Sequence, residues 1–192
     1  MKAIVCLSVF VFLGALAAVA AEQVQPDIAK FKLLGDPTSE QGAVWSYDST
    51  DDGVDYKLTG TLFKPTGAGP FPAVLISHGM GNYAQNYGAK ISKEMLKWGL
   101  VCIAPNYTYG ARAYAAGSPG AADIQNTNVP DNLRRAHKCL DLLKALGYVD
   151  VQRIALHGHS KGAFLTVAIA GAFPAEIRAA SHTAGGEQSY NK

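Results

Sequence analysis

The sequence has 192 residues, of which 48% are apolar and 17% are charged, and its formal net charge is +2. This length suits one globular domain, and the apolar fraction excludes an intrinsically disordered chain. The small net charge and the lack of a basic block exclude an evident nucleic-acid-binding surface. We therefore expect no nucleic-acid partner.

The first 20 residues have the layout of a secretory signal peptide. Lys2 is followed by an unbroken apolar run that ends in the small residues Ala18-Val19-Ala20. We expect cleavage near Ala20 and export to the periplasm or the medium, with no membrane association after cleavage. The alternative is an uncleaved membrane anchor, because residues 3–21 are nearly long enough to span a bilayer.

An irregular N-terminal arm is predicted for residues 21–42, which are polar and interrupted by prolines. The domain itself is predicted at residues 43–192. It begins with two segments of alternating character, 43–49 and 55–65, and the turn signal Asp51-Asp52-Gly53 lies between them. This pattern predicts an antiparallel hairpin.

From residue 72 onwards, short apolar runs alternate with helical patterns. Apolar runs predict buried strands at 73–77, 100–104 and 153–157, and residues 177–182 predict a fourth strand. Helical spacing of apolar residues predicts helices at 87–98, 131–146 and 161–173. Such alternation predicts an α/β fold with a mostly parallel sheet and helices on both faces. The last helix is apolar on every side, so we expect it to be buried all round.

Four candidate site residues fall at the ends of these strands. They are His78, Pro105, Ser160 and His182. Ligands and substrates of parallel sheets bind beyond the carboxyl ends of the strands. Four separate segments are therefore expected to meet at one edge of the sheet.

The connection at residues 105–130 is unusually long and carries Tyr107, Tyr109, Arg112 and Tyr114. Two interpretations are open. The aromatic and arginine side chains line a ligand pocket, or the segment is an ordinary surface loop. The first interpretation supports a binding module as the alternative to an enzyme.

The pentapeptide Gly158-His159-Ser160-Lys161-Gly162 lies between the predicted strand at 153–157 and the helix that follows. This context of strand, sharp turn and helix is the one that a nucleophilic serine in G-x-S-x-G requires. The free N–H groups and the dipole of the helix would converge on the Ser160 hydroxyl. The flanking glycines are needed because a β-carbon would clash with the neighbouring strand and helix. The alternative is a purely structural glycine turn.

These segments resemble the α/β-hydrolase superfamily and, within it, the dienelactone-hydrolase-like branch. The resemblance covers roughly residues 55–186. The segments that carry it are PAVLISHGMGN (72–82), WGLVCIAPNY (98–107), VDVQRIALHGHSKGAFLTVAIAG (149–171) and IRAASHTAGG (177–186).

The resemblance implies an oxyanion hole built from two backbone N–H groups. One belongs to Met80, after the His-Gly turn, and the other to Lys161, the residue after the nucleophile. His78 is expected to hydrogen-bond nearby loops and to take no part in the chemistry.

The resemblance also implies the chain order Ser, then Asp or Glu, then His. After Ser160 the sequence holds one histidine, His182, and two acids, Glu176 and Glu187. Three interpretations are open. The chain is an incomplete, C-terminally truncated copy of a longer hydrolase; it is complete and uses a set such as His182 with Glu187; or it is a non-catalytic remnant that binds a ligand or partner through the cleft.

The preferred prediction is a serine hydrolase that cleaves an ester, lactone or related acyl bond of a small molecule through a Ser160 acyl-enzyme. No cofactor is expected. No metal site is expected either, because metal-ligand spacing is missing and His157 and His159 are expected to face opposite ways. Cys102 and Cys139 are predicted to be buried free thiols. The substrate and the oligomeric state are not predicted.

Overall fold

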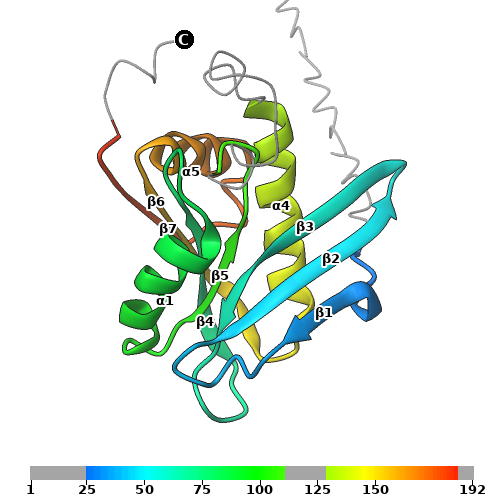
Figure 1. Cartoon of the computed structure of the whole chain (residues 1–192), viewed down its shortest axis with the longest axis vertical. Helices are drawn as coiled ribbons and strands as arrows, with labels where there is room; N and C mark the ends of the chain where they lie inside the picture. Colours follow the sequence, from blue (N-terminus) through cyan, green and yellow to red (C-terminus); the bar gives the residue numbers. More distant parts are fainter. Residues whose placement is uncertain (1–24, 111–128, 186–192) are drawn as a thin grey trace, which may run out of the picture.

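One mixed sheet runs through the part of the chain that the computed structural model describes, residues 25–110 and 129–185 (Figure 1). In spatial order its strands are β1 (Phe31–Leu34), β2 (Ala43–Asp51), β3 (Val54–Phe63), β5 (Val101–Pro105), β4 (Phe71–Ser77), β6 (Val149–His159) and β7 (Ala179–Thr183). The strands from β5 to β7 are parallel, and the first three join them antiparallel. The predicted fold class is confirmed. The predicted signal peptide lies outside the described residues.

The predicted hairpin is formed by β2 and β3, which pair along their whole length. Asp52 and Gly53 make the two-residue turn, and both have positive φ angles, 53° and 73°. These are the signs of the type I′ turn, which matches the right-handed twist of the paired strands.

The N-terminal arm is more regular than predicted for residues 21–42. A short 3-10 helix, η1 (Ile28–Lys30), leads into β1, which pairs antiparallel with β2. The side chains of β1 are exposed or half-buried, so the strand has no buried face to mark it in the sequence. Its backbone hydrogen bonds to β2 hold it in the sheet.

The four parallel strands agree with the predicted runs to within a few residues. β4 and β5 are buried along most or all of their length, as expected for strands that are covered on both faces. β7 differs, because it forms the edge of the described sheet and all of its residues are exposed. β6 is the longest strand and extends to His159, directly before the serine of the pentapeptide.

Helices cover both faces of the sheet (Figure 1). On one face lie α4 (Val129–Ala145) and α5 (Lys161–Ala172), and on the other lie the π-helical turn η2 (Ala84–Gly88) and α1 (Ala89–Leu96). The larger hydrophobic core lies under α4 and α5. Ala136, Leu140 and Leu143 of α4 belong to this core, as does Leu146 directly after the helix.

α5 is buried on the side that faces the sheet but not all round. Leu165 and Ile169 are buried, whereas Val167 is 37% exposed. The prediction of a helix enclosed on every side is therefore wrong for the described structure. In the described ranges, no helix is long and apolar enough to cross a membrane.

Candidate active site

Ser160 alone connects β6 to α5 and has an unusual backbone conformation. Its φ and ψ angles are 51° and −116°, values close to those at the first central position of a type II′ turn, where glycine is preferred. A non-glycine residue held there stores about 1–3 kcal/mol of strain. The Ser160 N–H donates to the carbonyl oxygen of Thr183 at 2.9 Å, so the turn is tied to β7.

The two glycines that flank this turn are required by close packing. A β-carbon on Gly158 would lie 2.2 Å from the carbonyl oxygen of Gly162. A β-carbon on Gly162 would lie 2.1 Å from the carbonyl oxygen of Ser77, at the end of β4. The predicted clash with the neighbouring strand and helix is confirmed. The close approach brings the N-terminus of α5 against the carboxyl ends of β4 and β6.

The turn after β4 packs directly on Ser160. A β-carbon on Gly79 would lie 3.3 Å from the Ser160 Cβ. The next N–H groups are engaged, since Gly81 donates to Tyr109 and Asn82 donates to Gly79. Within the described ranges the N–H of Met80 makes no hydrogen bond, which is the state expected of an oxyanion-hole donor.

The second predicted donor is the N–H of Lys161. It is the first residue of α5, and the first N–H groups of a helix have no acceptor in the helix itself. Met80 follows Gly79, which packs on Ser160, and Lys161 directly follows Ser160 in the chain. Their role as an oxyanion hole stays a prediction.

His78 is completely buried beneath this site. Its Nδ1 lies 2.9 Å from the Gly79 carbonyl oxygen, and its Nε2 accepts from the Tyr107 N–H at 3.3 Å. Because Nε2 accepts, the proton is on Nδ1 and the ring is neutral. Burial lowers the pKa of His78 to about 4. The expected structural role of His78 agrees with this geometry.

Tyr107 and Tyr109 do not line a pocket, so the pocket interpretation fails for both. They are only 4% and 1% exposed, and their rings lie against each other and against His78. The Tyr107 hydroxyl also lies 2.9 Å from Ser77 Oγ. Both tyrosines therefore support the turn after β4. Arg112 and Tyr114 lie outside the described residues.

His182 lies at the same end of the parallel strands as Ser160. It precedes Thr183, the last residue of β7, whose carbonyl oxygen accepts a hydrogen bond from the Ser160 N–H. It is exposed and pairs in register with Gly158. Its assignment as the base stays a prediction. Glu176 does not reach this end of the strands, since it precedes β7 and its carboxylate pairs with His137 and Lys144 of α4. Glu187 lies outside the described residues.

The relative orientation of two histidines beside the turn was predicted wrongly. His157 and His159 lie two residues apart in a strand and so share a face, contrary to the expectation that they face opposite ways. Both rings stack on Tyr87. His157 lies 2.9 Å from Ser181 and His159 2.9 Å from Thr183, measured between ring Nδ1 and hydroxyl oxygen. Strand periodicity alone would have located this group.

Together, the parallel strands, the strained serine turn and its two packed glycines define an α/β-hydrolase-type protein. The family model described as Chlorophyllase matches residues 54–179, about two-thirds of the sequence. The chain belongs to the Chlorophyllase family. A comparison with curated protein sequences finds no significant match.

Solved structures with the same fold include a Klebsiella pneumoniae protein assigned as a dienelactone hydrolase, with 16% identity and a TM-score of 0.55 over 71% of this chain and 57% of that one. An acetyl xylan esterase from Paenibacillus sp. R4 has 20% identity and a TM-score of 0.53, with coverage of 78% and 51%. Est1E from Butyrivibrio proteoclasticus, solved with ferulic acid, has 23% identity and a TM-score of 0.52, with coverage of 68% and 49%. The chain thus spans about half the length of these structures.

Proposed function

We propose that the protein is a serine hydrolase that cleaves an ester, lactone or related acyl bond through a Ser160 acyl-enzyme. The observation that carries the proposal is the backbone of Ser160, held at φ 51° and ψ −116° between two glycines that admit no side chain. A structure keeps such strain where the surroundings enforce it, and functional sites are where it concentrates.

In the proposed reaction, Ser160 Oγ attacks the carbonyl carbon of the substrate and its proton passes to a histidine base. The negative charge on the carbonyl oxygen is stabilised by the N–H groups of Met80 and Lys161. Loss of one such donor typically raises the barrier by about 2.7–4 kcal/mol. The base then protonates the leaving alcohol, and water releases the acid from Ser160 by the reverse sequence of proton transfers.

His182 is the candidate base, because it follows Ser160 in the chain and lies on the strand to which the serine turn is bonded. A histidine from a longer form of the protein is the alternative base. The two are separated by His182→Ala. Made in a longer form of the protein, the variant loses most of the activity if His182 is the base and keeps nearly all of it if the base belongs to the added part.

An ester or related acyl substrate is supported by the esterases and hydrolases among the structural neighbours. Met80, one of the two residues whose N–H groups we propose as the oxyanion hole, has an apolar side chain that is 50% exposed. We therefore propose a substrate with an apolar group next to the carbonyl carbon.

A fluorophosphonate probe tests the nucleophile directly, because it phosphonylates activated serines. We expect labelling at Ser160, mapped by peptide mass spectrometry, and none in Ser160→Ala. Hydrolysis of p-nitrophenyl esters should disappear in the same variant while the circular dichroism spectrum is kept. The test is made on a full-length form: Ser160 left unlabelled there, or equal labelling of Ser160→Ala, would rule out this function.

Export remains a further proposal, supported by the signal-peptide layout of residues 1–20. N-terminal sequencing of the protein recovered from an expression host tests it. A mature N-terminus near Ala21 is expected, and an intact Met1 in the cell interior contradicts it.

A further inference from the structure

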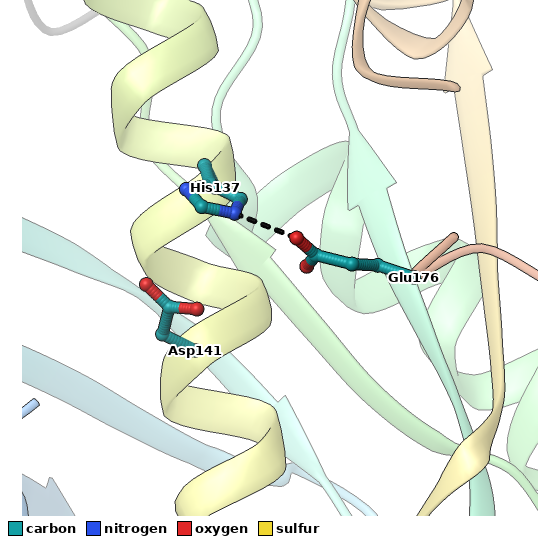
Figure 2. A group of neighbouring side chains, drawn as sticks. All are labelled: His137, Asp141 and Glu176. Atoms are coloured by element: carbon teal, nitrogen blue, oxygen red, sulfur yellow. Dashed lines mark hydrogen bonds and ion pairs between the residues drawn. The ribbon is translucent and has the colours of Figure 1, made fainter. Parts of the chain in front are cut away.

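Three side chains that commonly bind metal ions converge between α4 and the segment that follows α5 (Figure 2). His137 and Asp141 are one helical turn apart on α4, and Glu176 approaches them from the other segment. Their nitrogen and oxygen ligand atoms all lie within 4.8 Å of one another, and all three residues are half-buried. Ligand atoms around one zinc ion are about 3.3 Å apart, so only a small contraction separates this group from a coordination site.

The imidazole of His137 is held in a fixed orientation. Its ring stacks on Phe173 with the centroids 3.8 Å apart and the planes 8° from parallel. This packing directs Nε2 to Glu176 Oε1, at 3.0 Å. The Glu176 backbone is held as well, since its N–H donates to the Phe173 carbonyl oxygen at 3.1 Å. Two of the three groups are therefore positioned before any ion binds.

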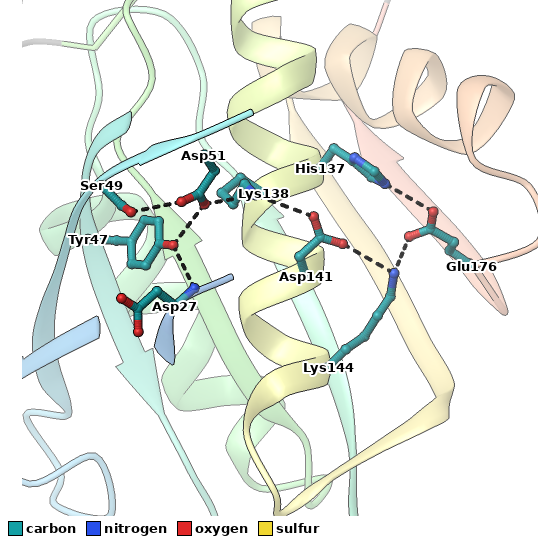
Figure 3. Close-up of polar contacts among 9 residues, drawn as sticks. All are labelled: Asp27, Tyr47, Ser49, Asp51, His137, Lys138, Asp141, Lys144 and Glu176. Atoms are coloured by element: carbon teal, nitrogen blue, oxygen red, sulfur yellow. Dashed lines mark hydrogen bonds and ion pairs between the residues drawn. The ribbon is translucent and has the colours of Figure 1, made fainter. Parts of the chain in front are cut away.

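Asp141 provides a second, independent observation. Its side chain is only 12% exposed, yet its ion pairs are long, 3.9 Å to Lys138 and 3.6 Å to Lys144. Each ammonium group lies closer to another carboxylate, Lys138 to Asp51 at 3.0 Å and Lys144 to Glu176 (Figure 3). In the described part of the chain, no hydrogen bond reaches the Asp141 carboxylate. Burial raises the pKa of Asp141 despite the nearby cations.

We propose that His137, Asp141 and Glu176 form a binding site for a divalent transition-metal ion such as zinc. The ion replaces the Lys144 ammonium group between the two carboxylates and gives Asp141 the close cation that it lacks. One imidazole and two carboxylates suit zinc and similar ions, whereas magnesium and calcium favour sites built from oxygen alone.

The site is structural rather than catalytic in position. Glu176 precedes the amino end of β7, whereas Ser160 follows the carboxyl end of β6. Because β6 and β7 are parallel, the two sites lie at opposite ends of these strands. A bound ion would link α4 to the connection between α5 and β7. Its loss should leave the reactivity of Ser160 in place, which separates this proposal from the proposed hydrolase activity.

The test is a titration of the metal-free full chain with zinc chloride, followed by calorimetry. We expect one site, and binding at least tenfold weaker in Asp141→Asn and in His137→Ala. Asp150→Asn and His159→Ala are matched controls, because they remove the same residue types elsewhere, and they should bind as the wild type does. No zinc binding by the wild type, or loss of binding in His159→Ala instead, overturns the proposal.

Lys144→Met separates the metal site from a simple ion-pair network. If zinc replaces the ammonium group, this variant binds zinc more tightly than the wild type. If it binds more weakly, the proposed exchange is wrong. Zinc should also raise the melting temperature of the wild type and of Lys144→Met by several degrees, but not that of Asp141→Asn. The cobalt complex should show the visible absorption of a tetrahedral site, which an unfolded variant cannot reproduce.

Discussion

A β-carbon on Gly162 would lie 2.1 Å from the carbonyl oxygen of Ser77, so the first turn of α5 is in backbone contact with the end of β4. Gly162→Ala is expected to destabilise the protein by about 3 kcal/mol or more, because neither backbone segment can move without disturbing the sheet. Urea denaturation measures this difference.

Gly171→Ala on the same helix is the control. A β-carbon there meets nothing within 4 Å, and alanine favours a helix over glycine by up to about 1 kcal/mol. The control should be neutral or slightly stabilising. Equal losses in both variants would show that the contact with Ser77 is not what requires a glycine at position 162.

The backbone of Ser160 leads to the second prediction. Ser160→Gly should raise the free energy of unfolding by about 1 kcal/mol, since glycine adopts the observed angles without strain. Ser160→Ala keeps a β-carbon and should leave the stability close to that of the wild type. If the glycine variant is instead the less stable of the two, the conformation of Ser160 is not strained.

The sequence predicted the parallel strands and the serine turn well, because both leave strong local signals. A run such as residues 73–76 is apolar throughout, and the pentapeptide has a glycine at each position where a side chain would clash. β1 was missed because it is held by backbone pairing and has no buried face. Burial of Tyr107 and Tyr109 was also missed, because aromatic residues in a loop suit a pocket and a core equally well.

The cluster on α4 shows a different limit. The i, i+4 spacing of His137 and Asp141 is visible in the sequence, but Glu176 is more than thirty residues away from both. Only the packing of α4 beside α5 brings it to them. The error over His157 and His159 had another cause, since strand periodicity already places residues i and i+2 on one face.

Acid should weaken the protein through His78. Its pKa is about 4 in the folded state against 6.5 in the unfolded state, so below pH 6.5 the unfolded chain binds a proton that the folded protein does not. Stability therefore falls as the pH decreases from 6.5 towards 4, with a total loss of about 3 kcal/mol from this residue. The free energies of unfolding measured by urea denaturation at pH 7 and at pH 5 should differ by about 2 kcal/mol.

The variant His78→Gln tests the assignment, because glutamine can still accept a hydrogen bond but does not titrate. The variant should flatten the dependence of the free energy of unfolding on pH between 6.5 and 4, even if it lowers the stability at pH 7. The pKa of His157 is also lowered by burial, so His157→Gln serves as a comparison. An unchanged slope in His78→Gln would show that other groups cause the acid sensitivity.

Asp51 and Lys138 form an ion pair that is almost fully buried, with side chains 7% and 6% exposed and 3.0 Å between Oδ2 and Nζ. Burial works against the charged form of Asp51, but hydrogen bonds from Ser49, Tyr47 and Lys138 hold the pKa of its carboxyl below the usual value. Asp51→Ala should lower the free energy of unfolding by about 3 kcal/mol, because it leaves the Lys138 ammonium group buried without its closest partner.

The exposed pair of Glu94 and Lys97 is the matched control. Its side chains are 62% and 67% exposed at a similar N–O distance of 2.8 Å, and exposed pairs contribute little. Glu94→Ala should change the free energy of unfolding by less than about 0.5 kcal/mol. The double variant Asp51→Leu with Lys138→Met should recover most of the loss seen in Asp51→Ala, because it removes both buried charges. If the double variant is less stable than Asp51→Ala, the penalty comes from the other hydrogen bonds of Asp51 and not from the unpaired ammonium group.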